Sequence, residues 1–324
     1  MGAGFASDRG VVVAVVGPTA SGKTELAIEI ARQLNTEIVS ADARQVFKGM
    51  AIGTAQPTQE ERQAVLHHLV DFLDPTELYS AGSFERDAVP ILDELCREKG
   101  AAVLAGGSGM YIKAALEGLD SLPADMEIRR QLNADLENLG LGHLVKQLEQ
   151  LDPEHAQRMD TSNPQRVVRA LEVCLASGQP FSSFHTSKKR RRNWHVVKVG
   201  LDPDRGELRE RIATRAQHML DLGWLQETHA LLPFRASNAL NTVGYKELFQ
   251  HIDGDVSLDE ALALTVTHTR QFAKRQMTWF RKDAHTIWFP YTAESRSATL
   301  KEAAAFAIQE VQRLQDTPFE SDAP

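Results

Sequence analysis

The sequence predicts an α/β fold in which a parallel sheet is flanked by helices and carries an inserted all-helical lobe. Two observations lead to this fold class. Short apolar runs that end in loops alternate with longer helical patterns, and this alternation is typical of a parallel sheet covered by helices. The alternation stops between Ser121 and His185, where only helical periodicity is found, and this segment is long enough to form a small lobe.

The predicted strands follow one another along the chain. Val11–Val16 is a run of mostly β-branched residues, as expected of a strand that is buried on both faces. Helical patterns at Glu25–Leu34 and Phe84–Lys99 separate the earlier strands from the later ones. Further strands are expected at residues 36–42, 68–74, 100–107, 196–202 and 286–289.

The lobe divides the sheet domain into two parts. Pro123 marks the entrance to the lobe, and the polar stretch SSFHTSKKRRRN (182–193) marks its exit. The end of the chain, QDTPFESDAP, has the composition of a disordered tail. The predicted organisation is a first part of the core at 10–120, the lobe at 121–187, a second part of the core with a basic helix at 188–312, and a disordered tail at 313–324.

Composition narrows the setting in which the protein works. The formal net charge is −8 with a pI near 5.8, so a nucleic-acid partner would have to bind a local basic surface. Cys96 and Cys174 are too few for a disulfide framework, and no apolar run approaches the ~18 residues of a membrane span. We therefore expect a cytoplasmic chain that has no membrane partner. A monomer is expected as well.

The stretch GPTASGKT lies between the first strand and the first helix. Gly17 and Gly22 allow backbone conformations that turn amide N–H groups toward an anion, and the start of the next helix points its positive dipole end at the same place. Lys23 adds a charge, and the Thr24 hydroxyl is placed to bind Mg²⁺. The motif predicts a P-loop NTPase-like sheet with a site for a diphosphate or triphosphate, which includes nucleotides such as ATP, although nothing in it recognises adenine. The predicted phosphate-binding residues are Gly17, Pro18, Thr19, Ala20, Ser21, Gly22, Lys23 and Thr24.

Polar residues just beyond two predicted strands are candidates for chemistry, because a parallel sheet binds ligands at the carboxyl ends of its strands. Asp42 would face the phosphate loop, either as a general base or metal-associated carboxylate, or as a helix cap or turn residue. Ser108 follows two glycines, and this pattern is also common in ordinary loops. Arg211 and Arg215 lie one helical turn apart, either on a solvated face or in the crevice, where one could neutralise a departing diphosphate.

Two basic stretches qualify the acidic average. Between residues 265 and 282, Arg270, Lys274 and Arg281 share one helical face, which suits a nucleic-acid backbone but is also compatible with a solvated helix. The run at 188–192 is compatible with a solvated linker. In the lobe, Arg166 and Arg169 are spaced to project from one surface.

Seven segments together resemble one known family, the tRNA dimethylallyltransferases, also called tRNA isopentenyltransferases or IPP transferases, which prenylate adenosine beside the anticodon. The resemblance extends from about Val11 to Phe289, and the segments occur in the family's order and spacing. They are GPTASGKT, SADARQVFKGMAIGTAQP, HHLVDFLDP with YSAGSFERDA, AGGSGMYIKAALEGL, NPQRVVRALEV, NTVGYKEL and TRQFAKRQMTWFRK.

The resemblance implies a role for each matching residue. The phosphate loop would hold the diphosphate of dimethylallyl diphosphate, with Mg²⁺ at Thr24. Asp42 would take a proton from the adenine N6 amine, and Ser108 and Arg215 would lie near the diphosphate and the reacting nitrogen. The insertion would close over the anticodon loop. Contacts with tRNA are implied, or expected from the basic helix, for Asp42, Ala43, Arg44, Gln45, Ser108, Arg129, Gln165, Arg166, Val167, Val168, Arg169, Gly244, Tyr245, Lys246, Arg270, Lys274 and Arg281.

The sequence departs from the family pattern at three positions near the expected site. Ser108 stands where Thr is common, and Ala43 and Phe47 replace a common Ser and Tyr. These changes concern the rate and fine substrate contacts. The zinc-finger extension and the transit sequence of eukaryotic relatives are absent, which favours a bacterial cytoplasm.

The predicted reaction moves the dimethylallyl group from dimethylallyl diphosphate to N6 of the adenosine 3′-adjacent to the anticodon and releases diphosphate. A P-loop small-molecule kinase would share the sheet and the phosphate loop but would not need the basic helix. A prenyltransferase acting on free adenine nucleotides would share the site but would not need a large RNA-facing surface. A non-enzymatic nucleotide switch would leave Asp42, Ser108 and Arg215 without a common purpose.

Overall fold

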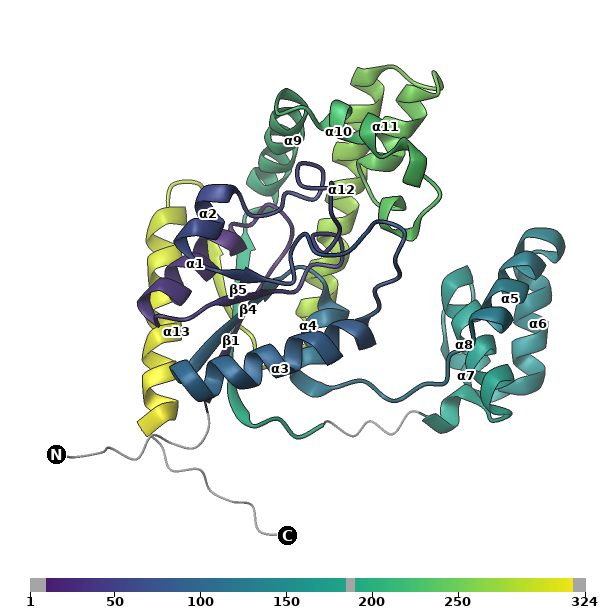
Figure 1. Cartoon of the computed structure of the whole chain (residues 1–324), viewed down its shortest axis with the longest axis horizontal. Coiled ribbons are helices and arrows are strands. Elements are labelled where there is room, and N and C mark those ends of the chain that lie inside the picture. The colour runs from purple at the N-terminus through teal and green to yellow at the C-terminus, as the bar shows by residue number, and fades with distance from the viewer. Residues whose placement is uncertain (1–9, 185–189, 317–324) are drawn as a thin grey trace, which may run out of the picture. The chain divides into compact units, whose positions relative to one another are not determined.

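A computed structural model describes residues 10–184 and 190–316, and the chain divides into two compact units (Figure 1). Unit 1 comprises the described residues of 1–117 and 191–324, and unit 2 those of 118–190. Unit 2 begins three residues before the predicted lobe, 121–187, and ends three residues after it. Residues 188 and 189 of the predicted basic run lie outside the described residues.

Within the described residues, unit 1 is built on a six-stranded parallel sheet whose strand order is β3-β2-β4-β1-β5-β6. Every adjacent pair is parallel, which confirms the predicted class of sheet. The strands are β1 Gly10–Val16, β2 Ile38–Ser40, β3 His67–His68, β4 Ala101–Gly106, β5 Trp194–Pro203 and β6 Ile287–Tyr291.

The predicted strand at 68–74 is wrong, because β3 ends at His68. Leu69 and Asp71 have φ angles of 60° and 59°, in the left-handed region that interrupts a strand. Their segment instead bonds to the loop after β2, where the Asp71 amide donates to the Gln45 carbonyl at 2.8 Å.

Helices cover both faces of the sheet, which explains the apolar first strand. Alternate residues of β1 point to opposite faces, and all seven of its residues are buried. Val11, Val13 and Val15 pack in one core with helices α1 and α13, while Val12 and Val16 pack in a second core with α3 and α4. These helices are α1 Lys23–Gln33, α13 Arg296–Asp316, α3 Ala81–Lys99 and α4 Gly109–Glu117.

A third group of helices lies over the loop that follows β2. Its core contains Phe47, Met50, Trp224, Tyr245 and Leu248, so the Tyr245 side chain is fully buried. The group includes α9 Arg205–Asp221, α10 Trp224–Ala230, α11 Tyr245–Ile252, α12 Leu258–Phe280 and the short 3₁₀ helices Leu232–Phe234 and Asn238–Leu240. A separate short helix, α2 Gln59–Ala64, lies between β2 and β3 in the chain.

Unit 2 is helical throughout its described residues, as predicted for the insertion. Its own core includes Leu132, Leu144, Leu148, Val167 and Leu171. The helices are α5 Met126–Leu139, α6 Leu141–Leu151, α7 Pro153–Arg158, α8 Pro164–Ser177 and the 3₁₀ helix Phe181–Phe184.

The end of the described chain is more ordered than the sequence predicts. Helix α13 continues to Asp316, with Val311 buried in the first core, so the predicted disordered tail is wrong for residues 313–316. Residues 317–324 lie outside the described part of the chain. None of the helices in the described ranges combines the length and the apolarity that a membrane crossing would need.

Candidate active site

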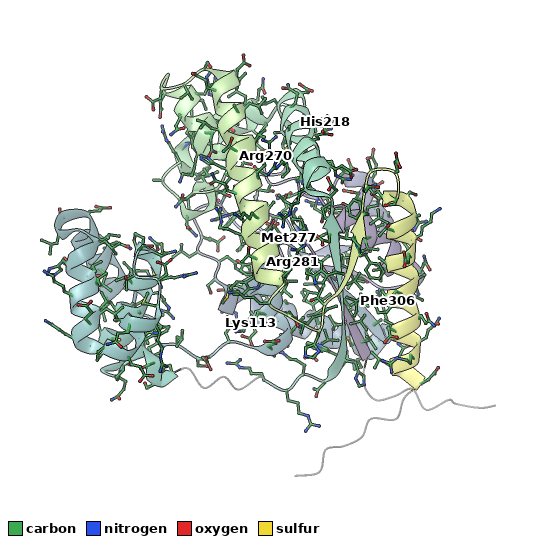
Figure 2. All side chains as sticks on the ribbon, turned by 180° about the vertical axis from the view of Figure 1, so that it is seen from behind. Lys113, His218, Arg270, Met277, Arg281 and Phe306 are labelled. Atoms are coloured by element: carbon green, nitrogen blue, oxygen red, sulfur yellow. The ribbon has the colours of Figure 1, made fainter. Side chains whose placement is uncertain are left out.

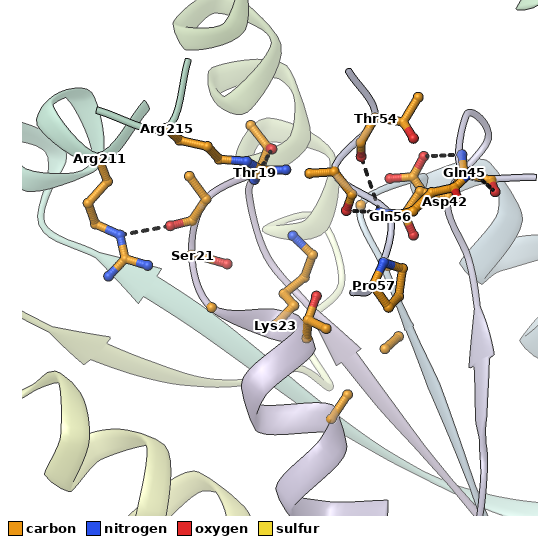
Figure 3. A pocket seen from close by; sticks show the side chains of 18 of the residues that line it. Thr19, Ser21, Lys23, Asp42, Gln45, Thr54, Gln56, Pro57, Arg211 and Arg215 are labelled. Atoms are coloured by element: carbon orange, nitrogen blue, oxygen red, sulfur yellow. Dashed lines mark hydrogen bonds between the residues drawn. The ribbon is translucent and has the colours of Figure 1, made fainter. Parts of the chain in front are cut away.

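The phosphate loop connects β1 to α1 and has the backbone that its glycines predict (Figure 3). Gly17 and Gly22 have φ angles of 148° and 91°, and a Cβ on Gly17 would meet the Leu201 carbonyl oxygen at 2.9 Å. Lys23 and Thr24 open α1, whose amino end faces the loop. The Lys23 ammonium donates to the Pro18 carbonyl of the same loop at 2.7 Å.

Side chains from distant parts of the chain hold this loop in place. Gln276 on α12 accepts from the Thr19 amide at 2.8 Å and donates to the Gly107 carbonyl at 2.9 Å. The Arg211 Nε donates to the Ala20 carbonyl at 2.9 Å, and the Tyr291 hydroxyl donates to the Ser21 carbonyl at 2.5 Å. The sequence does not reveal Gln276 or Tyr291 as part of the site, because each is separated from its partner by more than 160 residues.

Three charged groups meet beside the loop. Desolvation by the surrounding protein lowers the pKa of Lys23 to about 8, the Asp42 carboxylate opposes this change, and Arg215 adds to it. Desolvation also lowers the pKa of Arg215, again against the effect of Asp42, although a guanidinium stays charged near neutral pH. Lys23 and Arg215 are two cations that are poorly solvated by water, and they favour binding of an anion beside the loop.

The loop borders a cavity of about 770 Å³, here called the phosphate-loop cavity. Its walls combine the predicted phosphate-binding residues with polar side chains from the loop after β2 and from α9 and α12 (Figure 3). Lining residues that the argument uses are Thr19, Lys23, Thr24, Asp42, Gln45, Arg211, Arg215, Phe272 and Gln276.

A second cavity of about 430 Å³ adjoins the first and is here called the Ser108 cavity. It collects the predicted residues Ala43, Arg44, Ser108 and Lys246, which lie far apart in the sequence. The two cavities share six lining residues, which form their junction: Thr19, Ala20, Asp42, Thr54, Arg215 and Phe272.

Asp42 serves the local backbone with only one of its two oxygens. Its Oδ1 accepts from the amides of Arg44 at 2.9 Å and Gln45 at 3.4 Å, so Asp42 is a turn residue, as one of its two interpretations proposed. Within the described residues its Oδ2 accepts no hydrogen bond. The Ser108 hydroxyl accepts from the Ala43 amide at 2.9 Å and thereby fixes the same loop.

Some predicted RNA-contacting residues are buried inside the protein, so direct contact is wrong for them. Val167 and Val168 are 0% and 2% exposed in the core of unit 2. Tyr245 is fully buried, and its hydroxyl donates to Glu227 at 2.5 Å. Gly244 is also buried, and a Cβ there would meet the Trp224 ring. Val167, Val168 and Tyr245 pack in the hydrophobic cores beneath the exposed side chains of the same segments.

The arginines of the same segments remain partly accessible. Arg129 and Arg169 both donate to Glu172, whose side chain is fully buried. Burial alone would raise the pKa of Glu172, but the hydrogen bonds from Arg169 and Arg129 hold it below its usual value. Gln165 and Arg166 are exposed on the first turn of α8.

The basic residues of α12 lie along a groove between α9 and α12, with a volume of about 550 Å³. Arg270, Lys274 and Arg281 all line it, as their shared face predicts, and Arg270 and Arg281 are labelled along α12 in Figure 2. Arg281 differs from the other two, because it is paired with Asp202 at 2.8 Å. Arg205 and Arg209 of α9 line the groove as well.

Magnesium is compatible with the residues present. Thr24 lines the phosphate-loop cavity together with Asp42, and both offer the oxygen ligands that Mg²⁺ prefers. Among residues 10–184 and 190–316, no group of three or more His, Cys, Asp and Glu side chains could hold a metal ion. A bound Mg²⁺ would therefore depend on phosphate oxygens and water for most of its ligands.

Comparison with known proteins identifies the family. Residues 45–283 match the family described as IPP transferase. A tRNA dimethylallyltransferase from Christiangramia forsetii is 47% identical over 88% of this chain and 95% of its own length. The structure of the full-length tRNA isopentenylpyrophosphate transferase from Bacillus halodurans, 34% identical, covers 96% of this chain and all of its own with a TM-score of 0.69. A eukaryotic dimethylallyltransferase acting on tRNA, 23% identical, adds likeness of fold alone, with a TM-score of 0.80 over 97% of this chain and 82% of its own. The fold is thus P-loop NTPase-like, and the chain belongs to the IPP transferase family.

Proposed function

We propose that this chain transfers the dimethylallyl group of dimethylallyl diphosphate to N6 of the adenosine 3′-adjacent to the anticodon in tRNA and releases diphosphate. The observation that carries the proposal is the junction of the two cavities at Asp42 and Arg215. The phosphate-loop cavity suits the donor, and the Ser108 cavity suits an adenine base. The two substrates would meet beside the carboxylate.

The donor side supplies stabilisation of the leaving group. Lys23 and the loop amides bind the diphosphate, while Arg215 and Arg211 approach it from α9. As the bond between the allylic carbon and oxygen breaks, the diphosphate takes the electron pair, and these cations stabilise its growing charge. Mg²⁺, held by the Thr24 hydroxyl and diphosphate oxygens, would neutralise further charge on the same group.

The acceptor side supplies the base. An exocyclic adenine amine is a poor nucleophile, so N6 must lose a proton as it forms its bond to the allylic carbon. The Oδ2 of Asp42 takes that proton, because Oδ1 is held by the turn. Arg215 lines the same junction and would stand beside the carboxylate and the departing diphosphate.

A base inside a folded anticodon loop can reach the junction only after it is flipped out, at a cost of roughly a few kcal/mol. Cationic surfaces can offset this cost by binding the RNA backbone. The groove between α9 and α12 and the exposed arginines of unit 2 provide such surfaces. We propose that the chain does this as a cytoplasmic monomer.

Labelled dimethylallyl diphosphate and an anticodon stem-loop test the function directly. With Mg²⁺ present, label should enter one adenosine of the stem-loop, and Lys23→Ala should abolish transfer. Free AMP should be a far poorer acceptor, because it lacks the backbone contacts that position the base. Equal prenylation of AMP would favour the free-nucleotide enzyme. Phosphate transfer from ATP to a small molecule, with the allylic donor untouched, would favour the kinase.

A further inference from the structure

Phe272 is the only aromatic residue among the six that the two cavities share. It lies on α12 and is 40% exposed, an unusual fraction for a phenylalanine beside buried neighbours such as Ala273. The other junction residues already have partners or roles in the proposed chemistry. A large apolar ring is therefore accessible at the point where the two proposed substrates would meet, and it is available to contact one of them.

The ring is positioned by a rigid element. Gln276, one turn further along α12, bonds both to the phosphate loop and to Gly107, so this part of the helix is fixed relative to the site. The Arg275 guanidinium carbon lies 5.9 Å from the centroid of the Phe272 ring, and Arg275 also lines the Ser108 cavity. The arginine thus engages the ring from within the same helix.

The flipped adenine of the proposed acceptor needs a new stacking partner. A base that leaves its loop loses stacking on its neighbours, and proteins that bind splayed-out bases replace this stacking with aromatic side chains. Resting on the proposed function, we propose that Phe272 is the stacking subsite for the flipped adenine and orients its N6 amine toward Asp42. Stacking does not distinguish purines, so selection among bases belongs to the polar groups around it.

Two variants separate stacking from simple space filling. Phe272→Leu keeps apolar volume but removes the ring, and Phe272→Tyr keeps the ring. Kcat/KM for the stem-loop should fall roughly 5- to 150-fold in the leucine variant and stay near the original value in the tyrosine variant. KM for dimethylallyl diphosphate should not change in either. Phe72→Leu is a matched control, because Phe72 is 37% exposed and lines neither cavity.

A binding measurement without the donor gives a second readout. The readout is the fluorescence of a stem-loop that carries 2-aminopurine at the target position. This fluorescence should be quenched when the stem-loop binds the original chain or Phe272→Tyr, and much less when it binds Phe272→Leu. The inference is overturned if Phe272→Leu quenches normally, or if its main defect is a raised KM for dimethylallyl diphosphate, which would make the ring part of the donor site. If the original chain prenylates no RNA at all, the proposed function fails instead.

Discussion

Asp42 divides its two carboxylate oxygens between the backbone turn and the cavity junction. In Asp42→Asn, the amide oxygen can still accept from the Arg44 amide, so the turn and binding of the diphosphate should survive. Turnover should fall on the order of 10²–10⁴-fold, because no base remains. Single-turnover transfer measures this, with Asp71→Asn as a control in a turn outside both cavities. Near-normal turnover in Asp42→Asn would reduce Asp42 to its turn role.

Lys23 predicts a pH dependence of donor binding. Its pKa is lowered from 10.5 to about 8 in the free protein, and a bound diphosphate would raise it again. Above pH 8 binding must therefore take up a proton, and Kd for dimethylallyl diphosphate should rise by up to about tenfold per pH unit. Titration calorimetry at several pH values measures the slope. Lys23→Arg should bind without this dependence, and an identical slope in that variant would assign the effect to another group.

The same change in pKa has a defined sign for stability. Between pH 8 and 10.5 the unfolded chain keeps a proton on Lys23 that the folded free protein has lost, so this group makes the fold more stable as the pH rises through that window.

Residue patterns predict local chemistry better than distant contacts. The phosphate loop is readable because its glycines, lysine and threonine lie within eight residues. Gln276 is not readable, since its bond to Thr19 spans 257 residues and depends on how α12 packs. The sequence predicts RNA contacts for the whole segment that contains Val167 and Val168, whereas the helical period turns these two side chains into the core of unit 2.

At the scale of elements, α12 combines a cationic edge with a buried face. Arg270→Ala and Lys274→Ala should each flatten the plot of log affinity for tRNA against log salt by about 0.7–0.9 unit. Arg281→Ala should have a smaller effect, because Asp202 already neutralises it. Filter binding at several salt concentrations measures the slopes. Lys301→Ala, on the exposed side of α13, is the control. Slopes identical to that control would show that the groove carries only solvated charge.

The ends of β3 and α13 differ from those that the local sequence pattern predicts. A strand at 68–74 fits the apolar pattern, yet two residues in the left-handed region end β3 after His68. The end of the chain looks polar, yet burial of Val311 against the sheet carries α13 to Asp316. In both places tertiary packing overrides the local pattern.

At the scale of the whole molecule, the two units have separate hydrophobic cores. They should unfold in separate calorimetric transitions. Glu172→Gln should destabilise only the transition of unit 2, by about 1–3 kcal/mol, because it weakens the buried acceptor of two arginines. Dimethylallyl diphosphate with Mg²⁺ should stabilise only the transition of unit 1.

Glu149→Gln is the control for the unit 2 transition, since Glu149 is exposed on α6 of the same unit. A single transition that moves as a whole with every change would mean that the units fold as one.

The division into two units was readable from the sequence because the strand–helix rhythm stops and resumes. The rule that parallel sheets bind ligands at the carboxyl ends of their strands predicts that Asp42 and Ser108 lie at one edge of the sheet. The place of Arg215 beside them follows from the family resemblance, because the sequence pattern alone leaves its helical face open between solvent and the crevice. The two cavities and the place of Phe272 at their junction depend on side-chain packing and were not predicted.

The chain leaves unit 1 after Glu117, at the end of α4, and returns to it before Trp194, at the start of β5. Arg192, just after the point of return, donates to the Ala114 carbonyl of α4 at 2.8 Å, so the points of exit and return are near each other. A segment inserted between neighbouring points can change in length or composition without shifting the strands. Changes within residues 118–190 therefore need not disturb the strands that carry the phosphate loop.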